Sequence, residues 1–548
     1  MDFCTASCQA ARQHNPTETR LPFSHRPAGR TARHVLAATL AVAALAAGAA
    51  ACSTSSGPPQ GQAAAAGSAA GASGTIGFVN IPPSGWDPVT SKAGSDVNTL
   101  TFAYATLVQL DASGAASPGL ATAWSWSAGG KTLTLQLRKG VTFSDGTPFN
   151  AAAVVANINR AAFAADSEIA PELASVKSVT AVGGYQVAIH LSGLDYGLPL
   201  TLGGLPGMMV SPKAFAANAS ALATKPVGAG PFILTSYTPD NQATLVRNPD
   251  YYDASQIHVA RLVLQFVSEA QSVLSSLESG QSQIAMIAGT QVKAAEAAGL
   301  KVAVVPSLHA YSLSLNNTIS PLTNPDVAHA VGYALDRNAL LQTVSGGIGQ
   351  VDDEPFPPGY VGYAPSVAHY WYYDPAKARQ LLAASGLQHP AVTITWIEGG
   401  GLGGQPEAEQ IQAELDAVGF NAALREIPQA AAAEEVTVKH DVQFFPDGIA
   451  GRQSPVEELN NLYAADGLSN PSRDAAPAVT AALEGVAQYP LGSPQYVTAL
   501  QAATAAGVMN SDDFVLFTAP WIFAYSPSVT GFQHMISAPS LNGVRLAS

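Results

Sequence analysis

The chain of 548 residues is poor in cysteine and contains only three. Cys4, Cys8 and Cys52 lie near its start, and no cysteine follows. A protein cleaved before Cys52 would keep one thiol, at its first residue, with no partner for a disulfide. The sequence therefore offers no disulfide framework, and the position of Cys52 needs another explanation.

Basic residues are also scarce, with 25 Lys and Arg against 39 Asp and Glu and a net charge of −14. The residues before Cys52 carry five arginines and two acidic residues, a net charge of +3, so the remainder carries −17. Nucleic acids require a basic face, and we expect none as a partner. The acidic balance mildly favours cationic ligands without identifying one.

Common catalytic motifs are missing as well. The sequence has no G-x-S-x-G elbow and no H-E-x-x-H helix. Its eleven histidines are scattered, and after residue 51 none lies four positions from a carboxylate, so no metal site is predicted. His309, His329 and His440 are candidates for metal or haem contacts, although surface or core positions are the more common role for such histidines. We expect no enzyme, no catalytic residue, no cofactor and no metal.

An uncharged stretch, Val35 to Ala51, follows an arginine-containing segment and ends at Cys52. This order is typical of a secretory signal peptide, predicted here over residues 1–51. Seventeen mostly alanine residues are at the lower limit for spanning a bilayer, and a retained membrane helix is the alternative. No arginine pair precedes the stretch, so twin-arginine export is not indicated.

The small residues before Cys52 resemble the lipobox of bacterial lipoproteins, although that family usually has leucine where this chain has Ala49. The resemblance implies that Cys52 carries a lipid anchor; an incidental cysteine beside an ordinary cleavage site is the alternative. Residues 52–75 then form a flexible tether. They contain no charge and almost no large apolar side chain, so they cannot offset their ordering entropy.

The rest of the chain mixes strand and helix patterns. Residues 131–143 and 185–191 alternate apolar and polar side chains, which predicts half-buried strands. Asp374 and Gly386 are suited to begin and end one helix, and Gly419 is suited to end the next. We predict an α/β chain that contains antiparallel strands as well as βαβ units.

Three segments point to a family. They are "SPGLATAWSWSAGGKTLTLQLRKGVTFSDGTPFNAAAVVANINR" from Ser117, "PVGAGPFILTSYTPDNQATLVRNPDYY" from Pro226, and "VAHAVGYALDRNALL" from Val327 with "YDPAKARQLLAASG" further on. In this order the segments resemble the family 5 extracellular solute-binding proteins of ABC importers, which include oligopeptide, dipeptide and nickel binders. The resemblance extends to "SPSVTGF", which begins at Ser526.

The resemblance implies a periplasmic-binding-protein type II-like fold. Such a fold has two lobes, a ligand cleft and a hinge, with an extra domain inserted in the first lobe. Two strand-like connections are expected to cross between the lobes. The expected divisions are lobe 1 over 76–109, 210–313 and 520–548, the inserted domain over 110–209, and lobe 2 over 314–519.

The resemblance also implies ligand-binding residues. Ser84, Gly85 and Trp86 follow the first strand, where the first lobe of the family touches ligand. In peptide-binding members an aspartate of the second lobe pairs with the α-ammonium of the ligand, and its position best matches Asp447. A carboxylate in a closed cleft can hold an ammonium by a charge-assisted hydrogen bond; alternatively, Asp447 and Gly448 form only a turn.

Phe445 and Trp396 complete the expected site in the second lobe. Phe445 lies in the same expected loop as Asp447, where the family commonly has a tryptophan, and Trp396 ends a predicted strand. Core packing is the alternative for both tryptophans, Trp86 and Trp396. The family usually has arginine two residues before the alanine of the third segment, where this chain has Ala328.

A competing motif lies at Gly399, Gly401 and Gly404, which have the G-x-G-x-x-G spacing of dinucleotide-binding proteins. A strand precedes the motif and a helix follows it. However, Glu398, Glu407 and Glu409 place three carboxylates where a pyrophosphate would bind the helix N-terminus. We therefore favour a binding protein without a nucleotide cofactor.

The sequence thus predicts an extracytoplasmic lipoprotein, anchored by lipid to the outer face of the cytoplasmic membrane. It would capture a small, peptide-like ligand as a monomer and deliver it to the permease subunits of an ABC importer. The alternatives are a sensor or envelope scaffold of the same fold and, with less support, an extracellular enzyme. The identity of the ligand is not readable from the sequence.

Overall fold

The computed structural model describes residues 72–547, except for residues 92–93, 112, 268, 399–403, 468, 512 and 536–537. The predicted signal peptide, Cys52 and most of the predicted tether lie outside the described residues. Among the residues that are described, no helix is both long enough and apolar enough to cross a bilayer.

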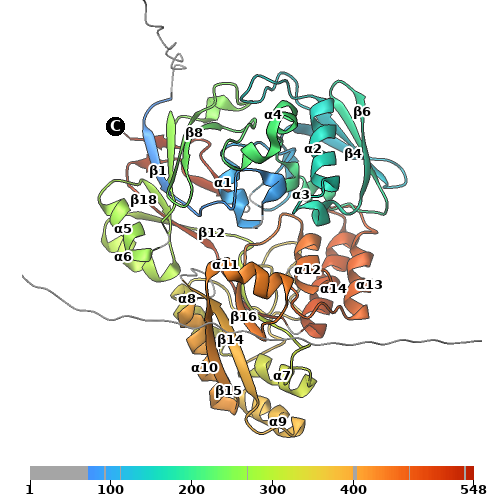
Figure 1. The fold of residues 1–548 in the computed structure, drawn as a ribbon, viewed down its shortest axis with the longest axis vertical. Coiled ribbons are helices and arrows are strands. Elements are labelled where there is room, and N and C mark those ends of the chain that lie inside the picture. The colour runs from blue at the N-terminus through green and yellow to red at the C-terminus, as the bar shows by residue number, and fades with distance from the viewer. Residues whose placement is uncertain are drawn as a thin grey trace, which may run out of the picture. The chain divides into compact units, whose positions relative to one another are not determined.

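Three sheets of four or more strands organise the described chain, beside three two-stranded ones (Figure 1). The largest has seven strands, in the order β12 (Lys301–Val305), β18 (Trp521–Tyr525), β11 (Ile284–Met286), β1 (Thr75–Val79), β10 (Arg261–Gln265), β9 (Gln242–Arg247) and β8 (Phe232–Thr238). β1 pairs in parallel with β10 and β11, whereas β9, β10 and β8 form an antiparallel meander. The sheet therefore mixes crossover and hairpin connections.

The start of β8 depends on glycine. A Cβ atom on Gly228 would lie 2.2 Å from the carbonyl oxygen of Ala103, and one on Gly230 would lie 2.4 Å from the carbonyl carbon of Ala103. Both distances are far below van der Waals contact, so only glycine lets the two backbones pass here.

A second, antiparallel sheet of four strands is inserted between β1 and β8 in the chain. Its order is β4 (Ala121–Trp126), β5 (Thr132–Leu137), β7 (Gln186–Leu191) and β6 (Val176–Gly183). Leu133, Leu135 and Leu137 of β5 are buried, as their alternation predicts. Helix α2 (Ala151–Phe163) packs on β6 and β7 (Figure 1). The Asn150 side chain accepts a hydrogen bond from the amide of Ala153 in the first turn of this helix.

The third sheet has five strands, in the order β15 (Asn421–Ile427), β14 (Ala391–Ile397), β16 (Phe444–Ile449), β13 (Ala310–Leu315) and β17 (Phe514–Thr518). One face packs on helices α7 (Pro325–Ala334), α8 (Arg337–Ser345), α9 (Pro375–Ser385) and α10 (Gln405–Val418). The other face packs on α12 (Pro455–Tyr463), α13 (Pro477–Val486) and α14 (Pro494–Asn510), which lie together in Figure 1.

Helix boundaries in this region follow local chemistry. The side chain of Asp374 accepts hydrogen bonds from Ala376 and Lys377, and α9 ends at Gly386 in a left-handed conformation. α10 ends in the same way at Gly419, with φ of 115°. The sequence predictions of these helix ends are confirmed. The described part of the competing glycine motif, Gly404, is only the residue before α10.

Candidate ligand-binding site

The seven-stranded and five-stranded sheets are joined by two short crossovers, between β12 and β13 and between β17 and β18. The crossovers are hydrogen-bonded to each other. Ala519 N donates to His309 O at 2.9 Å, and Ser307 Oγ donates to Ala519 O at 2.7 Å. Beside them, Gln350 and Thr518 exchange two backbone hydrogen bonds of 2.8 Å. The passage between the sheets is therefore a narrow, hydrogen-bonded strip.

Aromatic side chains pack against the two crossovers. His309 stacks on Trp521 with ring centroids 5.1 Å apart and planes within 10°, and it meets Tyr311 edge-on at 4.9 Å. Only 3% of His309 is exposed, and burial lowers its pKa to about 4. The imidazole is therefore neutral at pH 7. This position makes His309 part of the aromatic packing at the crossover.

The carboxyl ends of β14, β15, β16 and β17 all lie on the edge of the five-stranded sheet from which the crossovers leave. β16 is antiparallel to β13 and ends at Ile449, opposite Ala310, the first residue of β13 after the crossover. β14 runs parallel to both β15 and β16. Ligands of open α/β sheets bind outside the carboxyl ends of strands, so the loops that follow these strands are the candidate site.

The loop after β16 makes an ion pair with a residue of the segment that carries the four-stranded sheet. Arg452, three residues after β16, places Nη1 2.7 Å from Oε1 of Glu172. Glu172 lies in a short helical turn between α2 and β6, in the segment that carries the four-stranded sheet. The two side chains are 21% and 17% exposed. This partly buried pair therefore ties the loop after β16 to the inserted segment.

Further acidic residues lie near the Arg452–Glu172 pair, with few basic residues to balance their charge. Glu457, in the first turn of α12, has its pKa raised to about 8 by burial and by the neighbouring charges of Glu172 and Asp195. Burial also raises the pKa of Asp195, despite its hydrogen bond from Ser175. The loop after β16 thus lies in an acidic environment.

Burial of Glu457 predicts a pH dependence of stability. The folded chain keeps this proton between about pH 4.5 and 8, whereas the unfolded chain has lost it, so this contribution to stability is lost as the pH rises toward 8. Glu457→Gln removes the ionisation, and we expect its melting temperature to fall less than that of the wild type between pH 5 and pH 8.5. Glu484→Gln, at an exposed position on α13, should follow the wild type. Parallel melting curves for all three proteins would contradict the prediction.

The first-lobe residues of the expected site are engaged in the structure. The hydroxyl and the amide of Ser84 both donate to the Asp96 carboxylate. Trp86 is fully buried, meets Tyr237 edge-on at 5.7 Å, and its carbonyl accepts from Tyr104. Core packing, the alternative for Trp86, is what the structure shows for this side chain.

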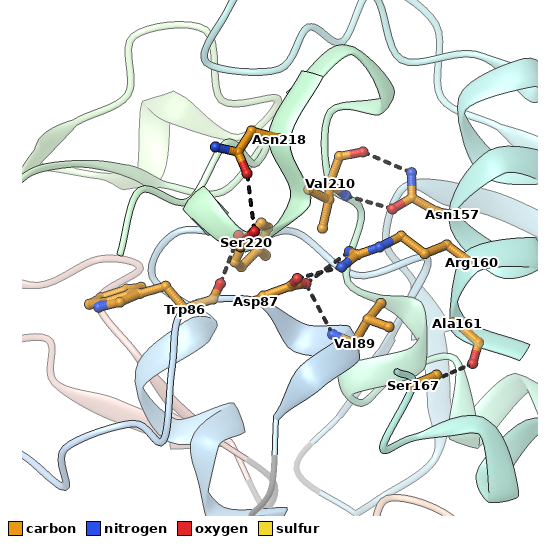
Figure 2. A network of polar contacts seen from close by, with 11 residues as sticks. Trp86, Asp87, Val89, Asn157, Arg160, Ala161, Ser167, Val210, Asn218 and Ser220 are labelled. Atoms are coloured by element: carbon orange, nitrogen blue, oxygen red, sulfur yellow. Dashed lines mark hydrogen bonds and ion pairs between the residues drawn. The ribbon is translucent and has the colours of Figure 1, made fainter. Parts of the chain in front are cut away.

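An ion pair fixes the residue that follows. Asp87 accepts two hydrogen bonds from the Arg160 guanidinium of α2, the one from Nη1 being 2.9 Å long (Figure 2). In the same view Asn157 bonds both the amide and the carbonyl of Val210, at 2.9 and 2.8 Å. The ion pair attaches the segment of Gly85 and Trp86 to α2, and the bonds of Asn157 attach Val210 to the same helix.

The second-lobe residues are placed differently from the expectation. Phe445 and Asp447 do not lie in a loop, and Asp447 and Gly448 do not form a turn: both residues belong to strand β16, and Asp447 lies opposite Ser312 of β13. Pairing with β13 keeps the backbone extended where the Asp-Gly pair favours a turn. Burial raises the pKa of Asp447.

Trp396 lies near the end of β14, as predicted, and is 8% exposed in the core that contains Phe444. Because alternate residues of a strand point to opposite faces, Phe445 and Asp447 face the other side of the sheet from Phe444. The side chains of Trp396 and Asp447 therefore lie on opposite faces, and the structure does not bring them together.

Sequence reasoning missed Arg452 and Glu172. Each is an ordinary charged residue in a polar stretch, and 280 positions separate them. The only signal was that Arg452 precedes Glu457 and Glu458 by five and six positions in a chain with few basic residues.

The fold and this site define the chain as a binding protein of the two-lobed α/β class. The sequence model of the bacterial extracellular solute-binding proteins, family 5 (middle), matches residues 115–470. The match covers more than half of the chain, and the chain belongs to this family. The family is one of solute-binding proteins, so the prediction of a binder and not an enzyme is confirmed.

Individual relatives agree with the family. The glutathione-binding protein GsiB of Escherichia coli is 28% identical over 323 residues, which are 58% of this chain and 63% of the relative. The corresponding protein of Pectobacterium atrosepticum is 29% identical over 325 residues, 58% of this chain and 62% of the relative. The chain thus spans less than two thirds of the length of these relatives.

Solved structures show the same fold. The binding protein DppA from Helicobacter pylori, in complex with the peptide STSA, has a TM-score of 0.78 at 22% identity and covers 87% of this chain and 98% of its own. AgaA from A. tumefaciens, in complex with agropinic acid, has a TM-score of 0.77 at 23% identity, with 87% and 99% covered. The predicted fold class is confirmed.

Proposed function

We propose that this chain is an extracytoplasmic receptor that captures a small, peptide-like ligand and delivers it to the permease subunits of an ABC importer. The observation that carries the proposal is the arrangement at the crossovers, where strand ends of one sheet meet a second sheet through two short connections. Such a geometry permits closure around a ligand. The glutathione-binding relatives and the peptide complexes of similar fold support the peptide-like character of the ligand.

We propose the lobe divisions given by the sequence, with lobe 1 built on the seven-stranded sheet and lobe 2 on the five-stranded sheet. The ligand would lie at the carboxyl ends of β14 and β16, between these sheets. Ser84, Gly85, Trp396, Phe445 and Asp447 remain proposals for ligand contact. Trp86 would hold Ser84 and Gly85 in place, since its side chain is buried and its amide and carbonyl are hydrogen-bonded to Ala223 and Tyr104.

Closure upon binding tests the proposal. Mass spectrometry of gently purified protein identifies the compound that co-purifies, and glutathione and a panel of dipeptides serve as further probes. We expect small-angle scattering to give a smaller radius of gyration when the protein is saturated with a compound that binds. Identical scattering curves for the free and saturated protein would count against a receptor that closes, and turnover of the compound would indicate an enzyme.

We further propose that Cys52 anchors the protein by lipid at the outer face of the membrane, with residues 52–75 as a tether. Cys52→Ser should release the protein from the membrane fraction into the medium, because the thioether to lipid cannot form. The measurement is immunoblotting of membrane and medium fractions. A variant that stays in the membrane fraction would support the alternative, a retained apolar helix.

A transport-independent sensor or scaffold of the same fold is the second candidate for the function. A sensor would also close on a ligand, so scattering does not distinguish it from a receptor. Uptake of the labelled ligand by cells with and without the protein does distinguish them, since only a receptor should be required for uptake.

A further inference from the structure

The segment that carries the four-stranded sheet also contacts helix α12 and the residue before it. A Cβ atom on Gly197 would lie 3.4 Å from Oγ of Ser454, which directly precedes α12. Leu200, in the short helix α3 (Leu198–Thr201), belongs to the same buried apolar cluster as Leu459 of α12. Figure 1 shows α3 next to α12. We call this meeting of the two parts of the chain the α3–α12 contact.

Carboxylates approach the α3–α12 contact from both sides. Glu172 and Asp195 belong to the inserted segment, and Asp195 accepts a hydrogen bond of 3.1 Å from the Gly197 amide just before α3. Glu457 lies in the first turn of α12, and Arg452 contributes the guanidinium that pairs with Glu172. Three carboxylates beside one guanidinium carry an excess of two negative charges when all four groups are ionised. Like charges repel more strongly in a partly buried contact than in water, so full ionisation works against the contact.

Glu457 is the carboxyl that responds to charge from the opposite side of the contact. Burial and the charges of Glu172 and Asp195 raise its pKa to about 8, whereas Arg452 acts in the other direction. Further ionisable groups that act on these residues or on their neighbours are Asp447, Glu458, Asp466 and Tyr496. None of these four is basic, so they do not offset the excess of negative charge.

Opening of the contact changes the surroundings of Glu457. It separates this carboxyl from Glu172 and Asp195 and exposes it to water, so that its pKa falls toward the ordinary value of 4.5. Between about pH 4.5 and 8 the closed form therefore holds a proton that the open form has released. Closing takes up this proton, and its equilibrium constant rises as the pH falls within that window. Above pH 8 neither form holds the proton, and below pH 4.5 both forms hold it.

We propose that the α3–α12 contact links closure of the lobes to proton uptake, with Glu457 as the linked group, so that acid favours the closed form and alkali the open form. The inference rests on the proposed function in one respect, since it requires the two lobes to move relative to each other. It adds a condition for release: a captured compound is held more firmly at acidic than at alkaline pH.

The distance between two spin labels in the ligand-free protein tests the proposal. The full-length chain with its three cysteines replaced by serine contains no other thiol, so Val182→Cys and Tyr489→Cys can be labelled selectively. Val182 is 59% exposed on β6 of the inserted segment, and Tyr489 is 40% exposed after α13. As the pH falls from 8.5 to 5.5 at constant ionic strength, we expect the population with the shorter distance to grow. The closing constant should rise by up to about tenfold for each pH unit, the limit for one linked proton.

Two variants and one control assign the effect to the contact. Glu457→Gln and Asp195→Asn each remove one ionisable carboxyl, from opposite sides, and both should flatten the pH dependence of the distances. Glu484→Gln, at an exposed position on α13, should keep the wild-type response. Identical distance distributions of the unsubstituted protein at pH 5.5 and 8.5 would overturn the proposal, as would an unchanged pH response in Glu457→Gln. The distances separate this effect from the melting temperature, which depends on burial of Glu457 in any closed or open form.

A separate measurement distinguishes failure of this inference from failure of the proposed function. Scattering at pH 7 with and without glutathione or a dipeptide tests closure on a bound compound. Closure with such a compound, but no pH response in the label distances, would refute the proton linkage alone. A pH response that Glu457→Gln removes would support the linkage whatever compound the protein binds.

Discussion

Arg452→Met should weaken ligand binding by about ten- to a hundredfold. The substitution removes the ion pair to Glu172 and leaves the Glu172 carboxylate without its cationic partner. A hydrogen bond to a charged group contributes about 1.5–3 kcal/mol. Loss of the bond lowers the population of the closed form, and the apparent affinity for the ligand falls in the same proportion. Calorimetry with the ligand that co-purifies measures the change.

Two comparisons separate this effect from a general loss of charge. Arg425→Met removes a pair with Glu435 whose side chains are 43% and 24% exposed, and we expect less than a threefold change in affinity. The double variant Arg452→Met/Glu172→Gln should lose less than the sum of the single variants, because the two residues interact. An unchanged affinity of Arg452→Met would remove the pair from the binding mechanism.

Arg337→Met should destabilise the protein by about 3–5 kcal/mol, the range for removal of one member of a buried ion pair. Arg337 is 4% exposed and lies 2.7 Å from Oδ1 of Asp353. Its guanidinium also donates to the carbonyls of Gly332, Trp371 and Val515, and so connects α7, β17 and the segment before α9. Methionine fills much of the volume but removes the cation beside Asp353 and the donor to three carbonyls, so that Asp353 keeps the hydrogen bond from the Trp371 amide without its charged partner.

Urea unfolding measures this change. Arg379→Met, at an exposed position on α9, serves as the control and should change the free energy of unfolding by less than about 0.5 kcal/mol. Arg337→Met/Asp353→Asn should recover part of the stability, because no unpaired buried charge remains. A loss below about 1 kcal/mol in the single variant would show that the pair is not a stabilising contact.

The elements of the fold that were predictable are those with local signals. Asp374 and Gly386 define α9 through side-chain and left-handed caps that involve only neighbouring residues. The alternation of Leu133, Leu135 and Leu137 predicts β5 in the same way. The family resemblance added the arrangement of sheets, which no local pattern contains.

The candidate site was less predictable because its geometry depends on distant partners. Asp447 and Gly448 favour a turn by themselves, but the pairing with β13, more than a hundred residues earlier, makes them part of a strand. Trp86 and Trp396 are as suitable for a core as for a cleft, and only packing decides between these roles. Arg452 and Glu172 are 280 residues apart in the sequence, so no local spacing pattern could predict their contact.

The two crossovers restrict how the sheets can move relative to each other. A single connection would allow rotation about its own axis, whereas two connections joined by hydrogen bonds from Ala519 to His309 and from Ser307 to Ala519 resist torsion. Bending of both connections together leaves these bonds intact. If the two sheets close on a ligand as proposed, we expect the motion to be mainly a bending of both connections, so that a spectroscopic distance between one pair of labels, one on each sheet, should follow it.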